Sequence, residues 1–283
     1  MPAPAPPSPL TSKPSLLRQT LESLLAVVFP SPCVLCGQEL TGKLLGGACR
    51  ECLSTLEPYA GSLCARCGLP LAARIALPGY LCADCRRGEP HFDAARSYGI
   101  YAGTLRAAVL KLKFHRRERL GLELGELLIE PWRALEPAAA IDGTVLIVPV
   151  PLHTQRERER GYNQARLLAE GFRRAMRLRN GAARLKLEGR CLVRRRPTAP
   201  QSGLSLDARD ENVRGAFEVA ATARVQHADV ILVDDVMTTG ATASACAAVL
   251  KRGGARRVVV LTVARATPQF PDLAAPNPHQ TAG

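Results

Sequence analysis

The pattern of hydrophobic and polar positions divides the chain about a third of the way along. From about residue 92 onward, short apolar runs alternate with segments in which apolar residues recur at helical spacing. The predicted strands are Val145–Val148, Val230–Val233 and Val258–Val263, and the predicted helices are 162–178 and 241–252. Strands that alternate with helices are typical of a parallel sheet covered on both faces. We therefore predict an α/β domain over residues 91–267.

The rest of the chain lacks this alternation. Residues 1–32 begin with a proline-rich stretch and continue with leucines at helical spacing over 15–29, which predicts a disordered tail and an amphipathic helix. Residues 33–90 carry most of the cysteines and form a second, smaller predicted unit. Residues 268–283 are rich in proline and alanine and predict a loose tail. The length of 283 residues is enough for about two domains.

Eight of the ten cysteines form four CxxC pairs, all within the first third of the chain. The pairs are Cys33 and Cys36, Cys49 and Cys52, Cys64 and Cys67, and Cys82 and Cys85. A CxxC pair in a tight turn places two thiolates on one metal ion, and two such turns complete a tetrahedral zinc site. The spacing predicts a double zinc ribbon with two structural zinc ions, because four thiolates leave no position open for water.

The four pairs can be connected in more than one way. In the sequential arrangement, the first two pairs hold one zinc ion and the last two hold the other. We prefer it because 12 and 14 intervening residues are good ribbon lengths, although an interleaved cross-brace is also possible. A disulfide framework is a third possibility, but it needs an oxidising compartment. No stretch of the sequence is typical of a secretory signal, so we expect a cytoplasmic protein.

The overall composition favours an anionic partner. Lys and Arg number 38 against 25 Asp and Glu, which gives a net charge of +13. Hydrophobic residues make up 47% and charged residues 22%, which excludes a wholly disordered chain, a collagen-like repeat and a coiled coil. No apolar run approaches the roughly 18 to 20 residues of a membrane span. Aromatic residues are only 4% of the chain, so we expect contacts to phosphates rather than stacking if nucleic acid is bound.

The strongest chemical pattern lies at residues 230–242, VILVDDVMTTGAT. An apolar strand ends in Asp234 and Asp235, and a turn rich in hydroxyls then opens a helix. Free amides at a helix N-terminus suit a phosphate, and Gly240 allows the backbone to approach it closely. Adjacent carboxylates suit a pair of sugar hydroxyls and a nearby magnesium ion. The pattern is not a P-loop, because the sequence contains no G-x-x-x-x-G-K-[ST] motif.

Residues 230–242 resemble the phosphoribosyl pyrophosphate motif of type I phosphoribosyltransferases. The resemblance implies that Asp234 and Asp235 hold the ribose hydroxyls of phosphoribosyl pyrophosphate, bound with magnesium. It also implies that a run of residues wraps the 5′-phosphate, namely Met237, Thr238, Thr239, Gly240, Ala241 and Thr242. The resemblance predicts a parallel sheet of the phosphoribosyltransferase type.

Two further segments resemble other parts of the same family. PVPLH at 149–153 and RGYNQA at 160–165 resemble its pyrophosphate loop, and the implied site residues are Pro151, Leu152, His153 and Arg160. The segment from 194 to 217 resembles its mobile basic loop, and the implied residues are Arg196, Thr198, Gln201 and Arg209. Residues 149–215 hold 16 basic and 7 acidic residues, which agrees with binding of an anion.

Four CxxC pairs ahead of these segments resemble the ComF family, which is associated with DNA uptake in natural transformation and includes the GntX relatives. The resemblance implies single-stranded DNA as a second ligand and protein partners in the uptake machinery. One departure concerns Thr238, because purine-salvage transferases carry an Asp there that handles a proton of the base. Two hypotheses follow: a DNA-uptake accessory protein that binds phosphoribosyl pyrophosphate, or an active phosphoribosyltransferase with an unidentified acceptor.

Overall fold

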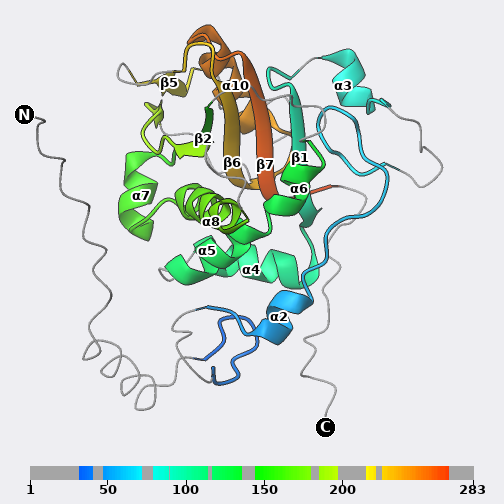
Figure 1. Ribbon diagram of the computed structural model, residues 1–283, viewed down its shortest axis with the longest axis vertical. Coiled ribbons are helices and arrows are strands. Elements are labelled where there is room, and N and C mark those ends of the chain that lie inside the picture. The colour runs from blue at the N-terminus through cyan, green and yellow to red at the C-terminus, as the bar shows by residue number, and fades with distance from the viewer. Residues whose placement is uncertain are drawn as a thin grey trace, which may run out of the picture.

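A five-stranded parallel sheet lies at the centre of the computed structural model (Figure 1). The structure describes residues 32–40, 47–71, 79–88, 90–113, 117–135, 144–179, 185–196, 215–220 and 225–267. In spatial order the strands are β1 (Ala94–Ile100), β7 (Arg257–Arg265), β6 (Asp229–Met237), β2 (Val145–Pro149) and β3 (Leu185–Leu187). Every neighbouring pair in this sheet is parallel, which confirms the predicted α/β class.

Helices cover both faces of the sheet. One face carries α4 (Gly103–Lys113), α5 (Glu118–Glu126), α6 (Ile129–Arg133) and α8 (Gln164–Leu178), and the other carries α10 (Ala241–Arg252). Alternate residues of β6 divide between the layers: Ile231 and Val233 pack with α8, and Val230 and Leu232 pack with α10. Because both faces are buried, the strand has a continuous apolar run instead of an alternating one.

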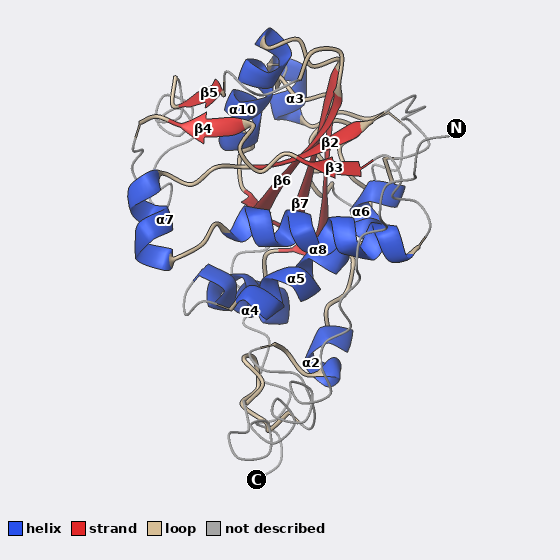
Figure 2. Cartoon of the chain, turned by 60° about the vertical axis from the view of Figure 1, so that its left-hand side comes forward, coloured by secondary structure: helices blue, strands red, loops and turns tan. Residues whose placement is uncertain are grey.

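The remaining elements are short. The cysteine-rich segment contains α2 (Arg50–Ser54) and α3 (Ala83–Arg87), α7 (Thr154–Arg160) follows β2, and β4 (Leu192–Arg194) pairs antiparallel with β5 (Phe217–Val219). Figure 2 shows α8, α5 and α4 stacked beneath the sheet, with α2 beyond α4. None of the described helices is long and apolar enough to cross a membrane.

The predicted elements of the α/β domain are confirmed with small changes in their bounds. Helix α10 spans the predicted 241–252, and β2, β6 and β7 contain the three predicted apolar runs. The helix predicted over 162–178 begins at Gln164, because Asn163 caps it: the Asn163 Oδ1 accepts a hydrogen bond from the Ala165 amide at 2.9 Å. Residues 1–31 and 268–283 lie outside the described residues, so the tails and the helix over 15–29 stay predictions. The domain boundary at residue 90 also stays a prediction.

Strand β1 was not predicted, and it lies between β7 and the cysteine-rich segment. On its outer side the Ala95 amide donates to the Arg66 carbonyl at 2.7 Å, and the Tyr59 amide donates to the Tyr98 carbonyl at 2.8 Å. Gly68 has φ +64°, and a Cβ there would lie 2.6 Å from the Ala95 carbonyl oxygen. The cysteine-rich segment therefore covers the edge of the sheet at close range, which satisfies backbone groups that an edge strand leaves unpaired.

Candidate functional site

The eight paired cysteines form two compact groups in the structure. Cys33, Cys36, Cys49 and Cys52 make one group, Cys64, Cys67, Cys82 and Cys85 make the other, and within each group all sulfur atoms lie within 4.8 Å of one another. The Sγ atoms of Cys36 and Cys49 are 3.8 Å apart, and those of Cys67 and Cys82 are 3.7 Å apart. A tetrahedron with zinc–sulfur bonds of about 2.3 Å has edges of about 3.8 Å. Both groups fit structural zinc ions, and the sequential arrangement is confirmed.

Backbone amides donate hydrogen bonds to two of the cysteine sulfur atoms, which stabilises the thiolate form that binds a metal ion. The Cys49 amide donates to the Cys33 Sγ at 3.2 Å, and the Cys82 amide donates to the Cys64 Sγ at 3.3 Å. Burial raises the pKa of the Cys33 and Cys64 thiols, but backbone hydrogen bonds lower it more and leave each pKa at about 7. The thiolate forms of Cys33 and Cys64 are therefore accessible near neutral pH, whereas burial raises the pKa of Cys52, Cys67 and Cys85.

The two cysteine groups attach to different parts of the α/β domain. The first group packs with the layer that contains α4 and α5, and the Ala48 amide donates to the Glu123 Oε2 at 3.0 Å. The second group packs with the α10 layer, and the Arg265 Nη2 donates to the Cys67 Sγ at 3.9 Å. Because Arg265 is the last residue of β7, the second group lies at the carboxyl end of the sheet.

The predicted sugar-phosphate residues surround a cavity of about 380 Å³ at that end of the sheet. Asp234 and Asp235 reach it from the end of β6, and the turn before α10 forms its wall. Gly240 has φ +90°, a left-handed conformation that glycine adopts without strain. Thr239 does not line this cavity, and its Oγ1 accepts a hydrogen bond from the Ala241 amide at 3.2 Å. The other implied phosphate-binding residues line it, namely Met237, Thr238, Gly240, Ala241 and Thr242.

The acidic pair interacts with a lysine that lies far away in the sequence. The Lys113 Nζ is 3.3 Å from the Asp235 Oδ2, and the side chain of Asp235 is buried. Burial lowers the pKa of Lys113, but Asp235 and other groups raise it more, so the lysine stays charged. Lys113 lines the cavity as the counter-ion of Asp235.

Asp234 has a raised pKa in the cavity. Burial and then the negative charge of Asp235 raise its pKa from 3.8 to about 7. Since the folded protein holds this proton more tightly than the unfolded chain, the contribution of Asp234 to stability is present below pH 3.8 and is lost as the pH rises through 7. A perturbed carboxyl group in a cavity is typical of a ligand-binding site.

We predict that Asp234→Asn stabilises the protein at alkaline pH. At pH 8 the free energy of unfolding should rise by ~1–3 kcal/mol, because Asn removes the cost of ionising a desolvated Asp234 and also its repulsion with Asp235. The gain should disappear as the pH approaches 4. Urea unfolding at several pH values measures it, with Asp229→Asn as the control. That change breaks the 2.5 Å ion pair with Arg256 and should destabilise. A variant no more stable than wild type at pH 8 would contradict the prediction.

The segment that resembles a pyrophosphate loop contributes side chains and structural support. Pro151, Leu152 and Arg160 line the cavity. His153 does not line it; its Nδ1 accepts from the Gln155 amide at 3.3 Å and caps α7. The Asn163 Nδ2 donates to the Val150 carbonyl at 3.0 Å, which ties the start of α8 to the end of β2. This segment therefore includes residues that shape the loop as well as residues that line the cavity.

Arginines line the same cavity as the acidic pair. Arg156, Arg160 and Arg194 line the cavity from α7 and β4. Burial lowers the pKa of Arg194, and the positive charge of Arg156 lowers it further. Such crowding of cations suits an anionic ligand. Arg196 is exposed beyond the end of β4, and the remaining implied loop residues, which are Thr198, Gln201 and Arg209, lie outside the described residues.

Sequence reasoning did not find Tyr101 or the role of Lys113 in this cavity. Both come from the segment between β1 and the end of α4. Lys113 lies in a run of basic residues of the kind found on exposed helix surfaces, so nothing in the local sequence indicated that it lines a cavity. The sequence did indicate Asp235, and a buried carboxylate needs a cation nearby. This was the only clue that a residue such as Lys113 lies in the cavity.

Comparisons with known proteins agree with this arrangement. A family model described as a double zinc ribbon domain matches residues 24–86. DNA utilization protein YhgH of Salmonella typhimurium is 33% identical over 239 residues, which cover 84% of this chain and 99% of that protein. Competence protein F of Haemophilus influenzae is 29% identical, and the match covers 78% of this chain and 91% of that protein. Competence protein ComFC of Bacillus subtilis is 27% identical, and the match covers 82% of this chain and 94% of that protein. The chain belongs to the ComF family.

Solved structures resemble the ComF-family chain only weakly. Glutamine phosphoribosylpyrophosphate amidotransferase from B. subtilis has a TM-score of 0.33 and 17% identity, covering 54% of this chain and 30% of that one. Hypoxanthine-guanine phosphoribosyltransferase from Schistosoma mansoni has a TM-score of 0.31 and 14% identity, covering 56% and 63%. Likenesses of this size do not indicate what the chain binds.

Proposed function

We propose that this ComF-family protein binds phosphoribosyl pyrophosphate with magnesium, also binds single-stranded DNA, and supports DNA uptake in natural transformation. The observation that carries the first part is the Asp234–Asp235 pair, of which Asp235 is buried, beside the glycine turn that opens α10. The DNA part rests on the net charge of +13 and on relatives named for DNA utilization and competence.

Each part of the ligand has a suitable partner in the 380 Å³ cavity. Backbone amides at the start of α10 suit the 5′-phosphate. The carboxylates of Asp234 and Asp235 accept hydrogen bonds from the ribose hydroxyls, and the arginines of α7 and β4 face the pyrophosphate. Carboxylate and phosphate oxygens are the donors that magnesium prefers, and the ion would neutralise part of the pyrophosphate charge.

Removing both carboxylates should weaken ligand binding at least about tenfold, since hydrogen bonds to charged groups contribute about 1.5–3 kcal/mol each. Calorimetry with magnesium phosphoribosyl pyrophosphate compares wild type with the Asp234→Asn, Asp235→Asn double variant. The matched control is the Glu118→Gln, Glu126→Gln variant, which removes two exposed carboxylates of α5. Equal affinity in the double variant and wild type would refute the proposed site.

The second candidate function is phosphoribosyl transfer to an unidentified acceptor. Thr238 lines the cavity where purine-salvage transferases carry an aspartate, and a threonine hydroxyl cannot act as a base near neutral pH. We therefore expect no useful turnover of adenine, guanine or hypoxanthine. An assay of pyrophosphate release, with and without single-stranded DNA, separates the two functions. Rates of order 1 to 10³ per second with a purine base would favour the transferase.

A further inference from the structure

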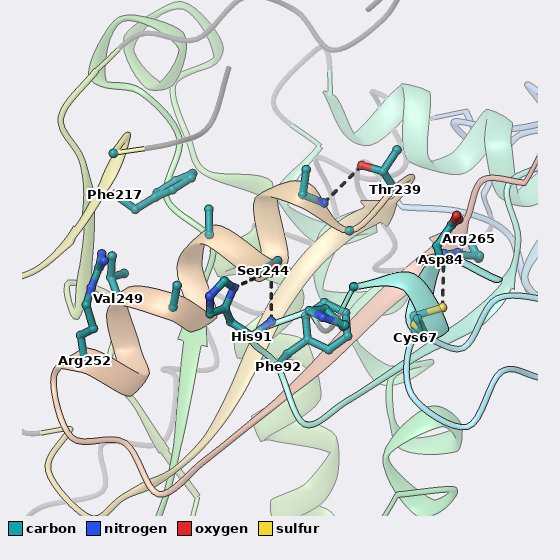
Figure 3. Close-up of a pocket in the computed structure, with 18 residues that line it drawn as sticks. Cys67, Asp84, His91, Phe92, Phe217, Thr239, Ser244, Val249, Arg252 and Arg265 are labelled. Carbon is teal, nitrogen blue, oxygen red and sulfur yellow. Dashed lines mark hydrogen bonds between the residues drawn. The ribbon is translucent and has the colours of Figure 1, made fainter. Parts of the chain in front are cut away.

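A second and larger cavity follows helix α10 along its whole length (Figure 3). Its volume is about 540 Å³, and it begins at Thr239, Gly240 and Ala241, the turn that also borders the sugar-phosphate cavity. The helix contributes one face, made of Ser244, Ala245, Ala248, Val249 and Arg252. From Ala241 to Arg252 this face extends for about 16 Å. The shape is therefore a groove, which suits an extended ligand better than a compact one.

The other wall of the groove comes from the second cysteine group and the residues that follow it. Figure 3 shows Cys67, Asp84 and Arg265 near one end and Phe217 near the other. In the middle, the exposed His91 is held against the helix, since its backbone amide and its Nδ1 both lie 3.1 Å from the Ser244 Oγ. Partly exposed small side chains of α10 leave room for a flat ring on the helix surface.

Arg265 gives this groove a buried hydrogen-bond donor. The residue is only 4% exposed, and its Nη2 donates to the Cys67 Sγ. Its Nε and Nη1 are buried and have no hydrogen-bond partner among the described residues. A buried donor without an acceptor is costly, so an acceptor on a ligand would be favourable here.

We propose that this groove holds bases of single-stranded DNA, with a backbone phosphate on the turn at Thr239–Ala241. The inference rests on the proposed DNA binding and assigns a place to it. The shared turn accepts the phosphate, and Arg265 meets an acceptor oxygen or nitrogen of a base. Arg252, exposed at the far end of α10, meets a following phosphate. A strand in this position would occupy the turn that phosphoribosyl pyrophosphate also needs.

The experiment compares a fluorescent oligothymidylate with an oligonucleotide of equal length whose sugars carry no bases. Wild type should bind the oligothymidylate about tenfold more tightly, because contacts to the bases add to the phosphate contacts. Ala248→Trp fills the groove and should reduce this ratio to about one while the affinity for the abasic strand is kept. Leu178→Trp, on the 78% exposed Leu178 of α8, is the control and should keep the ratio. Ala245→Leu is the second variant if Ala248→Trp does not fold, as judged by zinc content and unfolding midpoint.

The outcomes separate this proposal from the proposed function. Magnesium phosphoribosyl pyrophosphate should displace the oligothymidylate from wild type. If both strands bind wild type equally, or if Ala248→Trp keeps the tenfold ratio, the groove does not hold bases although DNA binding stands. If phosphoribosyl pyrophosphate binds without displacing the strand, the phosphate is not on the turn. If neither strand binds, the groove proposal and the DNA part of the proposed function both fail.

Discussion

Replacing Cys64 and Cys67 by Ser is expected to remove one zinc ion and to abolish binding of phosphoribosyl pyrophosphate. Replacing Cys33 and Cys36 by Ser should remove the other zinc ion but leave most of the phosphoribosyl pyrophosphate binding. Zinc binding contributes about 10–16 kcal/mol in small zinc domains, which is comparable to the whole stability of a domain. Each group of cysteines should therefore lose its structure when its metal is lost.

The difference between the two variants follows from their contacts. The second group holds Arg265 through Cys67 and lies against β1 at Gly68. Arg265 pairs with Met237 in the sheet, and the neighbouring Ala266 amide donates to the Met237 carbonyl at 3.0 Å. Met237 is the last residue of β6 before the phosphate turn. The first group reaches the domain through Glu123 of α5, away from that turn.

Metal analysis and calorimetry on the two double variants measure this effect. Cys191→Ala is the control, because Cys191 is buried but belongs to neither group and should leave both zinc ions in place. The prediction is wrong if both double variants bind phosphoribosyl pyrophosphate equally well, or if wild type carries no zinc.

The affinity for single-stranded DNA is expected to fall about 100-fold between 50 and 200 mM salt. For single strands, the logarithm of the binding constant falls with the logarithm of salt concentration by about 0.7 for each phosphate contacted, so about five contacts give this loss. The Arg194→Gln, Arg195→Gln, Arg196→Gln variant should show a smaller slope. Arg194 lines the sugar-phosphate cavity, and Arg195 and Arg196 are exposed beside it.

A second triple variant tests whether the location of these charges matters. Arg174, Arg177 and Arg179 are exposed towards the other end of α8, between about 15 and 22 Å along the helix from the cavity-lining Gln164. Changing them to Gln removes the same charge and should leave the slope nearly unchanged. Equal slopes for the two triple variants would indicate binding spread over the surface, and salt-independent binding would indicate stacking instead of phosphate contacts.

The features that were predictable depend on residues close together in the sequence. A CxxC pair and its partner pair close loops of 12 and 14 residues, so the spacing favoured the sequential sharing of metal ions that the structure has, although it left a cross-brace possible. Residues 230–242 contain a strand, a turn and the start of a helix without interruption. Their order placed Asp234, Asp235 and Gly240 at the carboxyl end of a sheet, where the structure has them. Local periodicity and local chain geometry were sufficient in both cases.

Long-range packing decided the rest. Strand β1, Ala94–Ile100, contains an arginine, a serine and a glycine and has little strand character, but β7 and the cysteine-rich segment supply hydrogen bonds on both of its sides. The contact of Lys113 with Asp235 and that of Arg265 with Cys67 join segments far apart in the chain. The groove along α10 exists only because the second cysteine group packs beside that helix. Periodicity describes which face of an element is buried, but it does not specify which distant element covers that face.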